Sequence, residues 1–355
     1  MDSASHINLI KRAIKSNLQE KAYGLLKSYG LYLSKKEHAQ IIRYVKKYAK
    51  YSAPVVRYLF YESPYCTEPL TQALIQNVFC DACKYGFADV VRLLLTDSKV
   101  DPSIFYNEPV QLASEYGHAD VVRILLEDDR VDPSYICSAA LQYACENSHL
   151  DVIRILLEDS RTDPSAQCYA SIETAYKAWQ HSKGCRTIVQ LLVYDHRIDI
   201  MALYSNFKER RTMYRDLLSI IYEDERFNPN CFDGYALQSA CYFNDIDLCY
   251  LLLNHKNFSI KEHTMRKHIK LACRCESTAI LQMLMGDERF KCILFDDAFL
   301  LKAALIEDCY SVFEWILYEY APSRFVSGVL LKMGRDIGYR KKYTELLLGK
   351  ITTSV

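Results

Sequence analysis

Three near-identical phrases, repeated at a constant spacing of 31 residues, constrain this chain more than any other feature. They read DVVRLLLTDSKVDPS at 89–103, DVVRILLEDDRVDPS at 120–134 and DVIRILLEDSRTDPS at 151–165. The aspartates of their Asp-Pro-Ser triplets, Asp101, Asp132 and Asp163, set the spacing. Self-similarity at such a period is typical of stacked repeats, in which each unit buries its apolar face against its neighbours. Single residues must therefore be interpreted as members of repeated columns.

Each unit is predicted to consist of two short helices joined by a turn, so the chain should be all-α. In the third unit the helices would span 138–146 and 151–158. A small residue at the packing centre of the first helix lets neighbouring helices approach closely. This alanine column comprises Ala82, Ala113, Ala144, Ala175, Ala240, Ala272 and Ala303.

The second helix opens with an acid, which suits the positive end of the helix dipole and is expected to cap free N–H groups. The acid column comprises Glu20, Asp89, Asp120, Asp151 and Asp247. An arginine follows three residues later in the best copies, and these i,i+3 pairs would each contribute about 0.2–0.5 kcal/mol. The arginines are Arg92, Arg123 and Arg154.

Weaker copies extend the pattern in both directions, which predicts about eleven helix pairs in one solenoid over residues 1–355. Divergent repeats would occupy 1–70, the best copies 80–200, and divergent repeats with a cap 228–355. The repeat at 201–227 is degenerate because Glu209 stands where the alanine should be. We expect that repeat to be a bend or a weak seam.

The order apolar-x-x-Ala, Gly-His, acid-Val-Val-x-Leu-Leu-Leu resembles the ankyrin repeat. It is clearest in VQLASEYGHADVVRILLEDDRVDPS at 110–134 and ALQYACENSHLDVIRILLEDSRTDPS at 140–165. The family's Thr-Pro-Leu-His motif and its Asp-Gly finger turn are absent, so the fingers should be short. The Asp-Pro-Ser endings are similar to those of divergent arrays in giant DNA viruses and some unicellular eukaryotes. The resemblance implies an ankyrin-type solenoid that acts as a non-enzymatic scaffold for protein partners.

Composition indicates in which compartment the protein is expected and which class of partner it is expected to bind. Basic and acidic residues number 44 each, so the charge pattern of a nucleic-acid-binding protein is absent overall. The distribution is uneven: residues 1–57 hold twelve Lys/Arg against three Asp/Glu, and residues 58–170 hold seven against eighteen. No apolar run could span a bilayer, and the start of the chain does not read as a secretion signal. We therefore expect a cytoplasmic monomer (host cytosol for a viral protein) with its fourteen cysteines reduced.

Aromatic residues in or beside the predicted finger turns are the candidate partner-binding residues, because exposed tyrosine is a favoured interface anchor. They are Phe105, Tyr106, Tyr135, Tyr169, Phe232 and Tyr235. Tyr106, Tyr135 and Tyr169 could form a ladder across three units, and the surrounding acids favour a basic partner. Alternatively, these rings only fill space between shortened fingers. A second hypothesis assigns nucleic acid or an acidic partner to the basic segment 35–57, although a solvated helix face gives the same pattern.

Other reactive residue types are better explained by the repeat. Cys80-x-x-Cys83 has half the ligands of a zinc site, but no second pair follows at the required spacing. Cys83 also follows a column alanine, where the other units place small residues. His118 and His149 are 31 residues apart in the inter-helix loop, where ankyrin units commonly carry histidine. We find no catalytic motif, and we predict no metal, no cofactor and no enzymatic activity.

Overall fold

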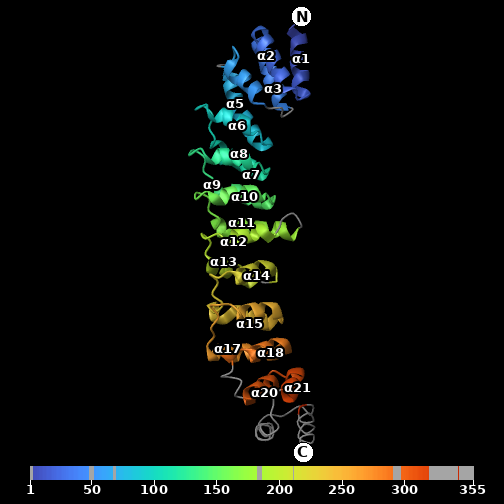
Figure 1. The fold of residues 1–355 in the computed structure, drawn as a ribbon, viewed down its shortest axis with the longest axis vertical. Helices are drawn as coiled ribbons and strands as arrows, with labels where there is room; N and C mark the ends of the chain where they lie inside the picture. The colour runs from blue at the N-terminus through green and yellow to red at the C-terminus, as the bar shows by residue number, and fades with distance from the viewer. Residues whose placement is uncertain are drawn as a thin grey trace, which may run out of the picture. The chain divides into compact units, whose positions relative to one another are not determined.

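The computed structural model describes residues 3–47, 52–66, 69–181, 186–210, 212–290, 297–319 and 343. The chain divides into two compact units, Met1–Asp199 and Ile200–Val355, each a stack of antiparallel helix pairs (Figure 1). The described residues contain helices and turns but no strands, as the periodicity predicted. None of their helices combines the length and apolar character needed to cross a bilayer.

Unit 1 contains six helix pairs within its described residues. The best-matching copies are α5 to α12; α6, α8 and α10 begin beside the repeated acids as predicted, whereas α12 has no acid in its first turn. In order, the elements are α1 Ser3–Lys15, α2 Gln19–Tyr29, η1 Gly30–Tyr32, α3 Lys35–Lys47, α4 Ala53–Arg57, the π-helical turn η2 Tyr58–Glu62, α5 Pro69–Tyr85, α6 Ala88–Leu95, α7 Ile104–Glu115, α8 Ala119–Leu126, α9 Tyr135–Glu146, α10 Leu150–Glu158, α11 Ala166–Gln180 and α12 Arg186–Val193.

Unit 2 contains four helix pairs within its described residues. Its elements are α13 Ile200–Phe207, η3 Lys208–Arg210, α14 Arg215–Glu223, α15 Cys231–Phe243, α16 Ile246–Leu253, α17 Glu262–Arg274, α18 Thr278–Gly286, η4 Glu288–Phe290, α20 Asp297–Ile306 and α21 Tyr310–Glu319. Apart from Tyr343, the last predicted pair lies outside the described residues. A single solenoid over 1–355 stays a prediction.

The alanine column is the packing centre of both stacks. All seven alanines are at most 2% exposed, and the small residues that follow them are fully buried, including Cys83, Cys145 and Cys273. The apolar residues of the second helices complete the core, as Val121, Val122 and Leu125 do in α8. Small first-helix residues therefore allow close contact, and branched residues of the second helix fill the space between pairs.

The acid column lies in the first turn of the second helices, but its predicted capping role is wrong. The N-terminal residues of α6, α8 and α10 receive no side-chain capping bond. Within α6, α8 and α10, which the structure describes, the column acid and the arginine three residues later do not form an ion pair. Arg92 instead lies 3.9 Å from the Glu127 carboxylate of the next repeat. Residues outside this column do cap helices: the Asp245 carboxylate accepts from the Leu248 N–H of α16 at 3.1 Å, and the Ser34 hydroxyl accepts from the Glu37 N–H of α3 at 3.4 Å. The column acids therefore stabilise α6, α8 and α10 through their negative charge at the positive end of the helix dipole.

Aromatic side chains replace the missing alanine in the degenerate repeat. Glu209 is exposed in η3, where α13 has already ended. Tyr204, Phe207 and Tyr214 are almost completely buried, with the Phe207 and Tyr214 ring centroids 4.8 Å apart. The core of this repeat is therefore built from large rings.

Candidate functional site

The loops that carry the predicted finger aromatics are built by the Asp-Pro-Ser triplets. In one copy, the Asp132 carboxylate accepts from the backbone N–H and the hydroxyl of Ser134 at 2.9 and 2.6 Å. Asp101 and Asp163 make the same two bonds to Ser103 and Ser165. An aspartate that bonds the backbone two residues ahead closes a tight turn. The triplet therefore fixes where each first helix begins.

Directly after this turn, the chain makes three consecutive left-handed residues. Phe105, Tyr106 and Asn107 have φ values of 49°, 64° and 62°. The same conformation recurs at 136–138, 167–169 and 232–234. It is unfavourable for residues with a side chain, at roughly 1–2 kcal/mol each, so the surrounding contacts must hold it. We call these segments the left-handed turns.

The third residue of the left-handed turn supplies one of those contacts by bonding the next loop. The Asn107 side-chain oxygen accepts from the backbone N–H of Asp132 at 2.8 Å, and the Ser138 hydroxyl accepts from that of Asp163 at 3.2 Å. Tyr169 occupies the same column and donates its hydroxyl to the Asp199 carbonyl at 3.4 Å.

This column corrects the predicted three-ring ladder. Tyr169 is only 9% exposed because it lies in register with Asn107 and Ser138, which also face the neighbouring loop. Tyr106 and Tyr135 do meet: their rings stack with centroids 5.7 Å apart and planes inclined by 8°. They are 67% and 39% exposed. The ladder therefore contains two rings.

Further apolar side chains flank the stacked pair. Phe105 precedes Tyr106 in its left-handed turn, and Ile136 opens the left-handed turn that follows Tyr135; both are more than half exposed. With Tyr106 and Tyr135 they form a surface that we call the finger edge. In unit 2, Phe232 is also exposed, but the Lys208 ammonium lies 3.3 Å from its ring centroid. Tyr235 is half-buried. The six predicted binding residues therefore do not form one surface. Phe105, Tyr106 and Tyr135 lie at the finger edge together with Ile136. Tyr169 is buried, and Phe232 and Tyr235 lie in unit 2.

Arginines beneath the fingers clamp one repeat to the preceding one. Arg161 donates from Nε and Nη2 to the Asp159 carboxylate and also donates to the carbonyl oxygens of Val131 and Leu126, at 2.9 and 2.8 Å. The pKa of Asp159 is held below its usual value by this guanidinium. Related Asp-x-Arg clamps occur at Arg130, Arg197 and Arg289.

The clamp arginines lie close to the acidic residues of the finger edge. Each does pair with one carboxylate, but its guanidinium also turns toward the preceding repeat. The exposed aspartates of the triplets attract the clamp arginines through space, but among the described contacts none of them forms an ion pair. In the sequence, the repeated Asp-x-Arg spacing is the pattern from which the clamp could have been predicted.

The histidine column is also structural. The His118 Nε2 lies 2.8 Å from the Lys84 carbonyl oxygen, and the His149 Nε2 lies 2.9 Å from that of Glu115. Each ring packs over a glycine of the preceding repeat. A Cβ at Gly117 would lie 2.5 Å from the His149 Nδ1, and the φ of Gly117 is +78°. The glycine therefore leaves space for the histidine as well as completing the turn.

The cysteine pair has the environment of core residues. Cys83 is fully buried, and burial raises the pKa of Cys80 to about 12. Protonated thiols are poor nucleophiles and poor metal ligands. In the part of the chain that the structure describes, no group of three His, Cys, Asp or Glu side chains could hold a metal ion.

The basic segment 35–57 is an amphipathic face. Ile41, Ile42 and Val45 of α3 are buried, whereas Arg43 is exposed and Lys46 lies 4.0 Å from Asp81. Tyr48, Lys50 and Tyr51 of the predicted site lie outside the described residues. Nothing here supports the nucleic-acid hypothesis over a solvated helix.

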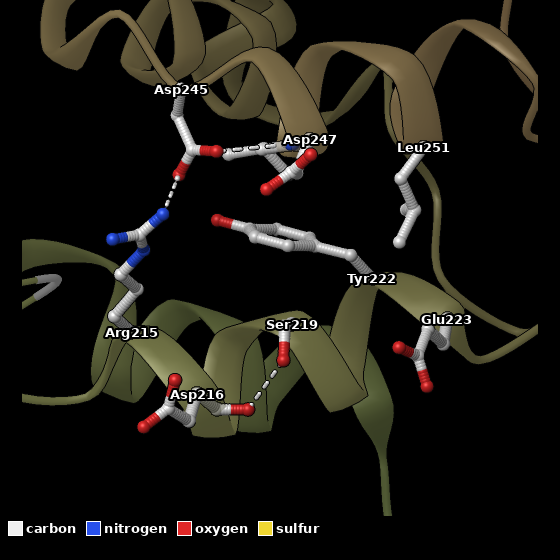
Figure 2. Close-up of a pocket in the computed structure, with 9 residues that line it drawn as sticks. Arg215, Asp216, Ser219, Tyr222, Glu223, Asp245, Asp247 and Leu251 are labelled. Atoms are coloured by element: carbon white, nitrogen blue, oxygen red, sulfur yellow. Dashed lines mark hydrogen bonds and ion pairs between the residues drawn. The ribbon is translucent and has the colours of Figure 1, made fainter.

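Unit 2 contains a cleft of about 260 Å³ between α14 and α16 (Figure 2). Tyr222 lies across its middle, and Arg215 closes one end through an ion pair of 3.5 Å with Asp245. Asp247 lies above the tyrosine and Leu251 lies at the other end. The remaining lining residues are Asp216, Ser219, Glu223 and Leu248. No motif in the sequence indicated this cleft.

Comparison with known proteins supports a repeat family. Residues 79–168 match the family model described as ankyrin repeats, in three copies. These residues include α6 to α10, the stacked tyrosines and the first two left-handed turns. Neither the curated proteins nor the solved structures gave a match.

Proposed function

Because this protein carries ankyrin repeats at residues 79–168, we propose that it is a non-enzymatic scaffold whose finger edge binds a protein partner. Ankyrin repeats generally mediate interactions between proteins. The finger edge and the adjoining first helices, which would form a concave face, are the proposed docking region.

The stacked pair of Tyr106 and Tyr135 is the observation that supports this proposal. Two exposed rings that stack on each other present a rigid apolar surface, and tyrosine loses little conformational freedom on binding. Phe105 and Ile136 extend that surface on both turns. The left-handed backbone, which is held by contacts between repeats, fixes these side chains before a partner arrives.

Charge favours a basic partner. The finger edge is bordered by Asp101, Asp132 and Asp163, which are exposed, while Arg130 and Arg161 turn toward the backbone of neighbouring repeats. Complementary charge speeds association and excludes partners of like charge. An extended segment or a helix with basic and apolar residues would suit this surface.

Affinity capture with the full chain tests the proposal. Tyr106→Ala and Tyr135→Ala should each weaken capture of the bound protein by about 2 kcal/mol or more, roughly thirtyfold in Kd. Tyr32→Ala is the matched control, since Tyr32 is an exposed tyrosine in η1 of the same unit. Circular dichroism should show that all three variants are folded.

Unchanged capture by both Tyr106→Ala and Tyr135→Ala would refute the finger edge as the docking surface. The stacked rings would then only fill the space between short fingers. Tyr169→Ala is unsuitable as a binding test, because Tyr169 is buried and its loss should destabilise the repeat.

A further inference from the structure

The second helices of unit 2 lack a basic residue that the best repeats of unit 1 place on the solvent side. Arg92, Arg123 and Arg154 occupy the fifth position of α6, α8 and α10. The fifth positions of α14 and α16 hold Ser219 and Tyr250. The acid column is kept in both, as Asp216 and Asp247. These two helices therefore retain their acids but lack a positive charge at the fifth position, although α14 begins with Arg215.

The cleft between α14 and α16 carries an excess of negative charge as a result. Its lining residues include four carboxylates, from Asp216, Glu223, Asp245 and Asp247, but one basic residue, Arg215. Arg215 is already paired with Asp245. Asp216 and Asp247 are exposed and form no ion pair within the described residues. A cation could therefore approach these two carboxylates from solvent.

Large apolar side chains lie beside the same cleft. Tyr250 is 64% exposed and lies one helical turn from Asp247, and Ile246 lies one turn before Tyr250. Tyr242 and Phe243 at the end of α15 are also exposed, with their ring centroids 4.9 Å apart. Phe243 borders a second hollow that shares Arg215 and Asp245 with the cleft. Exposed apolar side chains gathered beside a cleft indicate a binding surface.

We propose that the α14–α16 groove is a second docking surface, which takes a peptide segment of a partner with arginine or lysine beside aliphatic or aromatic residues. The basic side chain would place its charge against Asp247 and its methylene stem along Leu251, while Asp216 on α14 adds to the negative charge of the groove. The neighbouring apolar residues would pack on Tyr250. Charge complementarity selects this occupant, because an acidic segment would meet uncompensated carboxylates. The surface lies in unit 2 and does not involve the finger edge.

Fluorescence anisotropy with defined peptides tests this proposal. A short labelled peptide of alternating arginine and leucine should bind the full chain at physiological salt, whereas its counterpart with glutamate in place of arginine should not. The double variant Asp216→Asn, Asp247→Asn and the variant Tyr250→Ala should each weaken binding about tenfold or more. Asp120→Asn is the matched control, since Asp120 is exposed and holds the second position of α8, as Asp247 does in α16.

Tyr250→Arg should leave the fold intact, because arginine occupies this position in α6, α8 and α10. It should abolish binding, since it restores the positive charge and removes the ring. Tyr106→Ala should bind the arginine peptide like the parent chain, which separates this surface from the finger edge.

Three results would overturn the proposal. They are no binding of the arginine peptide to the parent chain, equal binding of the glutamate peptide, and binding that the groove variants leave unchanged. Sedimentation provides a further check. Self-association that the Asp216→Asn, Asp247→Asn variant removes would assign the groove to a second copy of this chain instead of a separate partner.

Discussion

Arg161 should stabilise the repeat array far more than a typical charged surface residue. Its guanidinium spans two repeats: it holds the Asp159 carboxylate of its own loop and donates to the carbonyl oxygens of Val131 and Leu126. Replacing Arg161 by alanine removes both bonds to the preceding repeat at once. The carbonyls then lose their partners in a half-buried position.

The expected loss follows from these contacts. A hydrogen bond to a charged group contributes about 1.5–3 kcal/mol when it is well buried. The Arg161 side chain is 35% exposed, so about 1–1.5 kcal/mol for each of the two carbonyl bonds is appropriate. The ion pair with Asp159 adds little at this exposure. We therefore expect Arg161→Ala to lower the free energy of unfolding by about 2–3 kcal/mol.

Urea unfolding followed by circular dichroism measures this loss, and native-state hydrogen exchange of α8 and α10 locates it, because stability in a repeat array is local. Arg123→Ala is the matched control: Arg123 is exposed on α8, and its removal should change stability by less than about 0.5 kcal/mol. Arg161→Lys keeps the charge but loses the planar fork, so it should recover only part of the loss. Equal effects of Arg161→Ala and Arg123→Ala would refute the clamp.

Three further predictions concern single side chains. Gly117→Ala should destabilise the protein, because Gly117 has a positive φ and the new Cβ would meet the His149 ring. Gly24→Ala in α2 should stabilise it by up to about 1 kcal/mol, because no atom lies within 4 Å of the new Cβ. Thermal melts of the two variants test the difference. Burial lowers the pKa of His268 to about 4 from 6.5, so its neutral form contributes stability above pH 6.5 that is lost as the pH falls to about 4; urea midpoints at pH 7 and 5 should therefore differ less in His268→Gln than in the parent. Cys145 is fully buried and burial raises its pKa, so a thiol reagent should label exposed Cys137 in the native protein and reach Cys145 only after unfolding.

The sequence alone determined the repeated helix pairs and their core. A period of 31 residues, with alanines and branched residues at fixed places within it, can be satisfied only if each unit buries the same face. The alanine column and the small residues after it, such as Cys145, are buried as predicted. The acid column lies in the first helical turn as predicted, although it does not cap. These features follow from local periodicity, so the sequence contains them in readable form.

The tertiary structure decided which side chains are accessible and which contacts join the repeats. Tyr106 and Tyr169 both follow an Asp-Pro-Ser triplet in the sequence, yet one is exposed and the other buried. The difference arises from the left-handed turn, where one residue of shift rotates a side chain from solvent toward the next loop. The Arg161 clamp and the α14–α16 groove join residues about one repeat apart in the chain, and their geometry depends on how closely the helix pairs stack. Periodicity fixes which residues face the core, but packing distances and backbone dihedral angles determine what the remaining side chains can touch.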